Sequence, residues 1–323
     1  MDDLKTSPAT RAYAARNGVD LQALAAETGR TTIGREDVDA KIGGANKGDA
    51  KIGGADKGDA RIGGANNGDA RIGGAAQRDD PAAYWDVDHA RYGPVEHEPV
   101  SRLARVAAKN LAAAQAMIPA VTHHDRADTT ALDAFRARLA PDAAARGLRL
   151  TALAFHVRAL ARTLRRHPRF NASLSPDGET LILKRYVHVG IAVDTPHGLM
   201  VPVIRDADRK GLWRIAAEID ALAAKARDRK LRPDEMGGAS MTISNLGGIG
   251  GSAFTPIVNP PEVAILGLTR TQTETAWHDG TPRPVPMLPL DLSYDHRVIN
   301  GADAAKFLAD LKTAIEKPET ILV

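Results

Sequence analysis

A tandem repeat with a period of ten residues occupies residues 39–78 and limits what the rest of the chain can fold into. Each unit reads Asp-Ala-Lys/Arg-Ile-Gly-Gly-Ala-x-x-Gly, and the last copy decays at residues 76–78. A unit holds one large apolar residue and three glycines, so it buries little surface and is entropically expensive to order. We therefore predict a flexible, disordered linker over residues 41–95. A β-solenoid or a calcium-binding repeat would need more apolar residues and more aspartates.

The linker leaves a short segment, residues 6–40, and a long one, residues 96–323, to form folded domains. Hydrophobic residues make up 43% of the chain but aromatic residues only 4%, so Leu, Ile, Val and Ala must build the core. The absence of cysteine excludes disulfides, thiolate metal ligands and a cysteine nucleophile. The net charge of +3 is spread without a basic stripe, and neither a membrane-spanning run nor a signal peptide is present. We expect a cytoplasmic protein that binds neither nucleic acid nor membrane.

Residues 96–323 alternate between helical and strand-like hydrophobic patterns, which predicts one α/β domain. Helical spacing is found over residues 100–117, 132–140, 150–165, 213–227 and 302–315. Strand patterns are found over residues 180–184, 187–193, 199–204, 240–244, 263–269 and 287–294.

The densest group of polar residues is the stretch 293–303, Ser-Tyr-Asp-His-Arg-Val-Ile-Asn-Gly-Ala-Asp. An apolar strand runs into a short polar turn and then into a helix capped by Asn300 or Gly301. The end of a buried strand is a common place for reactive groups in α/β folds. His296 can act there as a general base near neutral pH. Taken alone, a histidine beside an aspartate and an arginine is more often part of a structural hydrogen-bond network.

The motif Asp295-His296-Arg297-x-x-Asn300-Gly301 resembles the His-x-x-x-Asp-Gly motif of dihydrolipoyl acyltransferases, the core subunits of 2-oxo acid dehydrogenase complexes. Further segments similar to this family, in the family's order, are residues 184–186, 190–199, 201–205, 242–247 and 255–262. The resemblance covers essentially all of residues 96–323 and is closest to the pyruvate dehydrogenase branch, which implies acetyl as the acyl group. It implies a chloramphenicol acetyltransferase-like domain with a mixed sheet and flanking helices, a homotrimer with active sites between subunits, and assembly into a larger cage.

The resemblance also assigns catalytic roles. His296 matches the general base that takes the proton from the thiol of coenzyme A, so that the thiolate can attack the thioester of acetyl-dihydrolipoamide. Ser244, from a neighbouring subunit, matches the hydroxyl that donates a hydrogen bond to the oxyanion. From the residues alone, Ser244 would be a strand-end hydroxyl bound to its own backbone. Asn300 stands where most members have Asp; it can orient a ring or bind the intermediate but supplies no negative charge.

The other polar residues near these positions are expected to be structural. Arg297 should pair with a carboxylate and hold the turn. Ala120 stands where the family often has His, so one polar contact near the substrate channel is missing. His123 and His124 are adjacent and do not make a metal site, and no metal is expected.

Residues 6–40 resemble the peripheral subunit-binding domain of the same enzymes, through residues 7–11, 18–21 and 35–38. A small helical domain of this kind implies binding of the decarboxylase or the dihydrolipoamide dehydrogenase component. Arg11 and Arg16 match the basic residues that make this contact. The family's glycine-rich loop has lost most of its glycines at residues 26–30.

No lipoyl-domain pattern is found, and Lys57, inside the repeat, is not a credible attachment site. We expect the lipoyl group to come in trans from another subunit. Two other functions stay open. A stand-alone acyl-CoA-dependent acyltransferase acting on a small acceptor would not need the docking segment. A non-catalytic scaffold core subunit would not need His296 and Ser244.

Overall fold

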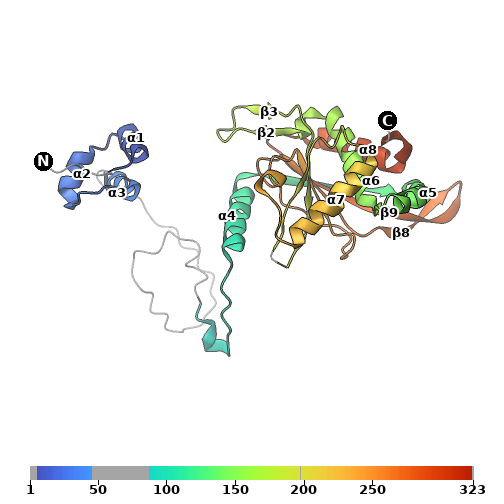
Figure 1. Cartoon of the computed structure of the whole chain (residues 1–323), viewed down its shortest axis with the longest axis horizontal. Coiled ribbons are helices and arrows are strands. Elements are labelled where there is room, and N and C mark those ends of the chain that lie inside the picture. The colour runs from blue at the N-terminus through green and yellow to red at the C-terminus, as the bar shows by residue number, and fades with distance from the viewer. Residues whose placement is uncertain (1–5, 46–86, 197, 322–323) are drawn as a thin grey trace, which may run out of the picture. The chain divides into compact units, whose positions relative to one another are not determined.

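The computed structural model describes residues 6–45, 87–196 and 198–321, in two compact units divided between Asp88 and His89 (Figure 1). Residues 46–86 hold most of the repeat, so the linker prediction and Lys57 lie outside the described residues. Among the described residues, no helix is both long and apolar enough to cross a membrane.

The amino-terminal unit contains three helices, α1 (Pro8–Arg16), α2 (Leu21–Thr28) and α3 (Arg35–Ala45). The hydroxyl of Ser7 caps α1 by accepting a hydrogen bond from the Thr10 N–H (3.1 Å), as the sequence predicts. Helix α2 begins at an Asp20 cap that the sequence analysis missed, and α3 continues five residues past position 40. The small core consists of Ala14, Leu24, Ile33 and Val38.

The second unit is built on a seven-stranded sheet with the order β1-β9-β7-β6-β4-β5, to which β8 adds beside β9. Its strands are β1 (Ala120–Asp128), β4 (Val189–Ala192), β5 (Val203–Ile204), β6 (Met241–Asn245), β7 (Ala264–Leu268), β8 (Gln272–His278) and β9 (Thr281–Asp295). Strand β6 runs parallel to β4 and β7, and the other pairs are antiparallel. The predicted mixed sheet is confirmed. Strands β2 (Ala172–Leu174) and β3 (Leu181–Leu183) form a separate hairpin.

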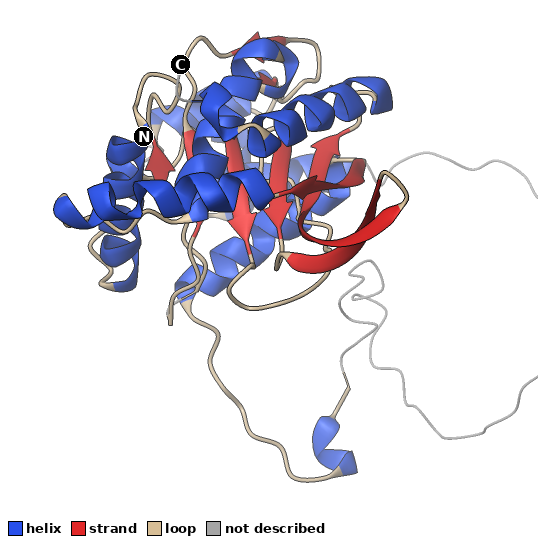
Figure 2. Cartoon of the chain, turned by 90° about the vertical axis from the view of Figure 1, so that its right-hand side faces the viewer, coloured by secondary structure: helices blue, strands red, loops and turns tan. Residues whose placement is uncertain are grey.

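Helices cover one face of this sheet (Figure 2). They are α5 (Thr130–Ala145), α6 (Ala152–Arg166), α7 (Leu212–Arg227) and α8 (Gly301–Glu316). The described residues also form short 3-10 helices at η2 (His89–Tyr92), which lies away from the sheet in the segment before α4, and at η3 (Pro168–Phe170), η4 (Pro233–Glu235) and η5 (Pro318–Ile321). Alternation along β6 sends Met241 and Ile243 into the core under α5 to α8. Thr242 and Ser244 therefore point to the opposite face.

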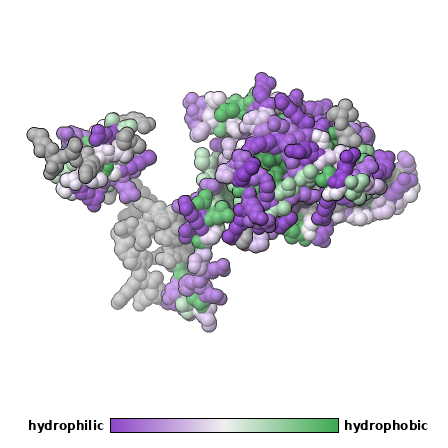
Figure 3. All heavy atoms as spheres, in the orientation of Figure 1, coloured by the Kyte–Doolittle hydropathy of each residue, from purple (hydrophilic) through white to green (hydrophobic). Residues whose placement is uncertain are grey.

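Helix α4 (Arg102–Met117) precedes the sheet and has an apolar face that the described residues leave uncovered. Leu103, Val106 and Leu111 are 48%, 50% and 43% exposed. Within the described helix, Ala114 alone is buried. Hydrophobic side chains accordingly interrupt the hydrophilic surface at α4 (Figure 3). Since such faces mark interaction sites, α4 is suited to contact another chain.

The structure shortens one predicted strand and contains three strands that were not predicted, β1, β2 and β8. The strand predicted over residues 199–204 shortens to Val203–Ile204, with isolated bridges at Met200 and Pro202. Strands β1 and β8 were not predicted, because they lie at the sides of the sheet and carry polar side chains.

Candidate active site

The turn that follows β9 is fixed by a buried carboxylate. Asp295 is 2% exposed, and both of its oxygens accept hydrogen bonds from the Arg297 guanidinium, at 3.0 Å from Nε to Oδ1 and 2.7 Å from Nη2 to Oδ2. The Arg297 backbone N–H also donates to Asp295 (3.0 Å). This bonding raises the pKa of Arg297, and the predicted structural role of Arg297 is confirmed.

His296 projects from this turn with its side chain exposed. Its backbone N–H donates to the carbonyl of Pro119 (3.1 Å), which ties the turn to the chain just before β1. Its ring lies 5.9 Å from the ring of Tyr294, which is buried. Neither ring nitrogen is hydrogen-bonded to a described residue, so the imidazole is free to receive a proton from a bound molecule.

Asn300 caps helix α8, as predicted for this position. Its side-chain oxygen accepts a hydrogen bond from the Asp303 N–H (2.9 Å). Its amide NH₂ group has no hydrogen-bond partner among the described residues. The oxygen is thus committed to the helix, and the NH₂ group remains available as a donor four residues from His296.

Ser244 lies near the end of β6, half-buried, on the sheet face that points away from α5 to α8. In the described part of the chain its hydroxyl binds no backbone group, unlike the strand-end hydroxyl that its residue type alone suggests. The hydroxyl is therefore available to donate a hydrogen bond outward.

The strand register separates Ser244 from His296. Ser244 pairs with Gly267 of β7, and Gly267 pairs with Asp291 of β9. His296 lies beyond Asp295, so it is more than about 13 Å further along β9, and it is about two strand spacings, roughly 10 Å, to the side. The structure brings His296 and Asn300 into one turn, but it does not bring Ser244 to them within one chain.

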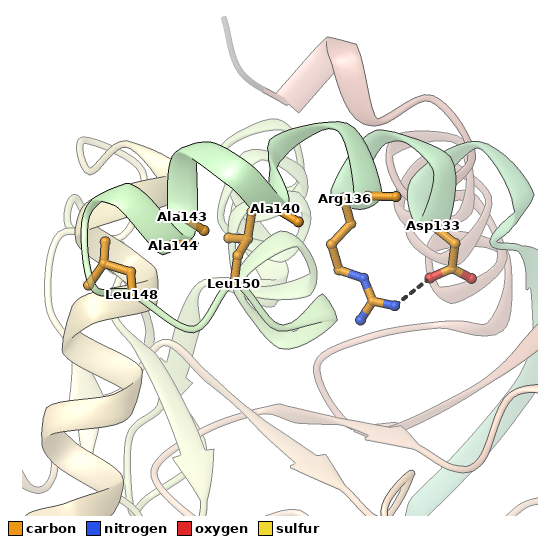
Figure 4. Close-up of a pocket in the computed structure, with 8 residues that line it drawn as sticks. Asp133, Arg136, Ala140, Ala143, Ala144, Leu148 and Leu150 are labelled. Carbon is orange, nitrogen blue, oxygen red and sulfur yellow. Dashed lines mark ion pairs between the residues drawn. The ribbon is translucent and has the colours of Figure 1, made fainter.

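A cavity of about 440 Å³ opens beside the turn. It is lined by residues of α4 and of the Pro260–Pro261 loop, and by Glu262, Asp295 and Arg297. A second cavity, along α5, is lined by four alanines, two leucines and the Asp133–Arg136 ion pair of 3.2 Å (Figure 4). The one carboxylate in that lining, Asp133, is paired with Arg136, and the other side chains are alanines and leucines, so this cavity is not a candidate for the chemistry.

A buried carboxyl group that the sequence analysis passed over lies close to the sheet. Glu262 is 7% exposed; Oε1 accepts a hydrogen bond from the Thr242 hydroxyl (2.9 Å), and Oε2 is buried without a described partner. Burial raises the pKa of Glu262 to about 7, although Thr242 and the Lys184 ammonium oppose this rise. Gly190 makes the arrangement possible, because a Cβ there would lie 2.5 Å from the Thr242 hydroxyl oxygen.

We expect the Glu262→Gln substitution to stabilise the protein at pH 8 but not at pH 5. The folded-state pKa of about 7 lies above the ordinary 4.5, so the stability linked to the neutral carboxyl is complete below pH 4.5 and is lost as the pH rises through 7. Glutamine stays neutral and can still accept from Thr242. Urea unfolding at a fixed protein concentration should show the variant gaining about 1–3 kcal/mol relative to wild type between pH 5 and pH 8. A difference that does not change with pH, or an equal change in the exposed control Glu98→Gln, would contradict this assignment.

The remaining predicted residues lie apart from this turn. His123 and His124 face opposite sides of β1, opposite Leu292 and Asp291, and His124 Nδ1 lies 2.6 Å from the Asp291 carboxylate. Arg11 is exposed on α1 of the other unit. Arg16 ends that helix, and its side chain lies outside what the structure describes. No group of three or more His, Asp or Glu residues that could hold a metal is found among the described residues.

Comparison with known proteins places the chain in a family. Residues 92–323 match the family described as 2-oxoacid dehydrogenases acyltransferase (catalytic domain), and the chain belongs to it. A relative from Pseudomonas aeruginosa, the dihydrolipoyllysine-residue acetyltransferase component of its pyruvate dehydrogenase complex, is 50% identical over 237 residues, 71% of this chain and 43% of its own length. The protein of that name from Staphylococcus aureus strain Mu50 is 37% identical over 320 residues, 99% of this chain and 71% of its own. The chain thus spans less than half of the Pseudomonas relative.

The fold matches a solved acetyltransferase structure. The dihydrolipoamide acetyltransferase of Azotobacter vinelandii aligns with a TM-score of 0.72 and 49% identity, covering 73% of this chain and 98% of that one. That crystallographic and enzymatic work concerns the role of a serine, a histidine and an asparagine in the catalytic mechanism. The serine precedes the histidine by 52 positions and the asparagine follows it by 4, which are also the spacings of Ser244, His296 and Asn300.

Proposed function

We propose that this protein transfers an acetyl group between dihydrolipoamide and coenzyme A, as the acetyltransferase component of a pyruvate dehydrogenase complex. The observation that carries the proposal is the imidazole of His296, which no described residue binds, on a turn held by the Asp295–Arg297 hydrogen bonds. The spacing of Ser244, His296 and Asn300 also matches that in a relative of 49% identity. The cubic core of a pyruvate dehydrogenase complex aligns equally well, with a TM-score of 0.72 and 50% identity.

In the reaction, His296 takes the proton from the thiol of coenzyme A. A free thiol has a pKa of about 8.5, so few are ionised near neutral pH and a positioned base raises the fraction that can react. The thiolate attacks the thioester carbonyl of acetyl-dihydrolipoamide and forms a tetrahedral intermediate. Collapse of the intermediate expels the dihydrolipoamide thiolate, which receives the proton from His296, so that protons and acyl groups balance.

Ser244 stabilises the intermediate by donating its hydroxyl hydrogen to the oxyanion, a contribution of about 3 kcal/mol in comparable sites. Because the register separates Ser244 from His296, the serine comes from a neighbouring subunit. In a homotrimer, the part of the sheet that carries His296 in one subunit would face the part that carries Ser244 in the next. Three such head-to-tail contacts close into a ring. The uncovered apolar face of α4 supports burial against another subunit. The NH₂ group of Asn300 is a second donor on the histidine side.

The amino-terminal unit recruits the decarboxylase or the dihydrolipoamide dehydrogenase component, with Arg11 and Arg16 as basic contacts. The exposure of Arg11 on α1 supports this role, as does the alignment of 99% of this chain with 71% of the Staphylococcus aureus protein. Such a complex component works in the cytoplasm.

The proposal is tested by acetyl transfer from acetyl-CoA to free dihydrolipoamide, measured with the full-length assembled chain. We expect turnover with acetyl-CoA that exceeds turnover with larger acyl-CoA donors. Transfer to a panel of small hydroxyl or amine acceptors, without transfer to dihydrolipoamide, would support a stand-alone acyltransferase. No transfer to any acceptor by a correctly assembled trimer would support a scaffold.

A further inference from the structure

The outward face of α6 carries a row of arginines. Arg158, Arg162, Arg165 and Arg166 follow one another at intervals of four, three and one residues, which places them on one side of the helix. Arg209, from the loop after β5, joins them. Together with Asp208 these residues line a cavity of about 590 Å³. All six lining residues are charged, five positively and one negatively.

Two of the arginines are held by neutral partners. Arg158 Nε donates to the Ile321 carbonyl (2.9 Å) and Nη1 to the Asp208 carbonyl (2.7 Å). Arg162 Nη1 donates to the Thr320 carbonyl. These bonds fasten the carboxyl-terminal turn η5 to α6 but neutralise no charge. The pKa of Arg158 is lowered by burial and then by the neighbouring Arg162, although the Asp208 carboxylate opposes this shift.

The carboxylates nearby do not balance the remaining cations. Arg165 pairs with Asp208 (2.9 Å). Arg166 lies 3.6 Å from Asp310, which also contacts His167 at 2.9 Å. Arg209 forms no ion pair with a described residue. Among the described residues, five guanidinium groups meet two paired carboxylates, so three positive charges remain in excess there.

We propose that this cavity binds a small anion with at least two phosphoryl groups, such as a diphosphate or a nucleoside triphosphate. Guanidinium groups bind phosphate oxygens through paired N–H donors, and an excess of three charges favours a multiply charged ligand over a single carboxylate. The arginines extend over about 10 Å of helix, a length that a chain of phosphoryl groups can follow. No aromatic residue lines the cavity, so it lacks the stacking platform of a single-stranded nucleic-acid site.

Two sources could supply this chemistry: a free polyphosphate, or the diphosphate of coenzyme A. Isothermal titration of the full-length assembled protein with pyrophosphate, ATP, coenzyme A and pantetheine separates them. We expect pyrophosphate and ATP to bind with a Kd of about 10–100 µM at low salt, and pantetheine, which has no diphosphate, not to bind at this cavity. Competition of coenzyme A with pyrophosphate would assign the site to the coenzyme, whereas simultaneous binding would assign it to a free polyphosphate.

The double variant Arg165→Gln/Arg209→Gln should weaken pyrophosphate binding at least about tenfold, because it removes two donors without disturbing the η5 contacts. Both side chains are exposed, so the variant should fold. The matched control is the double variant Arg227→Gln/Arg283→Gln, which removes two exposed arginines outside the cavity and so makes the same charge change. Arg165→Lys/Arg209→Lys should bind with intermediate affinity, since charge remains but paired donation is lost.

Absence of pyrophosphate and ATP binding to the wild type at about 1 mM ligand would overturn the proposal. Equal weakening by Arg227→Gln/Arg283→Gln would also overturn it, because the binding would then reflect general surface charge. These measurements do not depend on turnover, so they stand apart from the test of acetyl transfer.

Discussion

Replacing His296 with alanine is expected to lower the rate of acetyl transfer from acetyl-CoA to dihydrolipoamide by about a thousandfold. The substitution removes the proposed acceptor of the thiol proton, while the turn keeps its Asp295–Arg297 bonds and its contact with Pro119. Because the His296 side chain is exposed, the variant should fold and assemble as the wild type does. The measurement is kcat at saturating acetyl-CoA, with assembly checked by sedimentation.

The matched control is His97→Ala, an exposed histidine in the segment before α4, which should retain wild-type kcat. A His296→Ala variant that assembles correctly and loses less than about tenfold in kcat would show that His296 is not the base.

Chains that carry only His296→Ala and chains that carry only Ser244→Ala should recover activity when they assemble together. Each variant alone is expected to be slow, the serine variant by about a hundredfold or more. If the base and the oxyanion donor come from different subunits, a mixed trimer contains sites in which a subunit with His296 meets one with Ser244. Random mixing of equal amounts gives such sites in about a quarter of positions.

The experiment combines the two tagged variants by co-expression, isolates the mixed assemblies through both tags, and measures kcat per chain. Mixing the two purified assemblies without subunit exchange is the control and should restore nothing. A verified mixed assembly that stays as slow as its parents would contradict this prediction. It would mean that His296 and Ser244 of one site come from the same chain.

Much of the second unit could be predicted because its central elements bury one side. The strands over β6, β7 and the end of β9 are apolar, and α6 and α8 present regular hydrophobic faces. Even so, the buried face of α6 includes His156, whose two ring nitrogens have no described partner. Burial, and then Arg136, lower the pKa of His156 to about 4. A hydrophobic pattern predicts that such a helix face is buried, but it does not predict which polar residue on that face is buried as well.

The strands that were missed carry little hydrophobic signal. Strand β1 pairs only with β9, and most of its side chains are exposed or half-buried. Strand β8 is just as polar, although the Asp279–Gly280 pair at its end, with φ of 48° and 74°, is a hairpin signal that the sequence contained. Helix α2 was not predicted because it has only eight residues, which are too few to give a clear helical pattern after the Asp20 cap.

For the site, the family resemblance implied both the residues and their division between two subunits, whereas the pattern of residues alone implied only the residue types. His296, Asn300 and Ser244 follow from motifs, and the Asn300 cap follows from its position before α8. The separation of Ser244 from His296 depends on which strands pair and in which register, and a single sequence does not state this. Glu262 was missed because its burial results from strands that are distant in the sequence.

The register that separates Ser244 from His296 has a kinetic consequence. A folded but unassembled chain would contribute His296 to one site and Ser244 to another, so it would contain no complete site. Such a chain should neither transfer nor hydrolyse an acyl group. Catalytic capacity then follows the concentration of assemblies rather than of chains, and dilution below the assembly threshold should lower the activity per chain steeply. Newly synthesised chains would therefore not react with thioesters until they assemble.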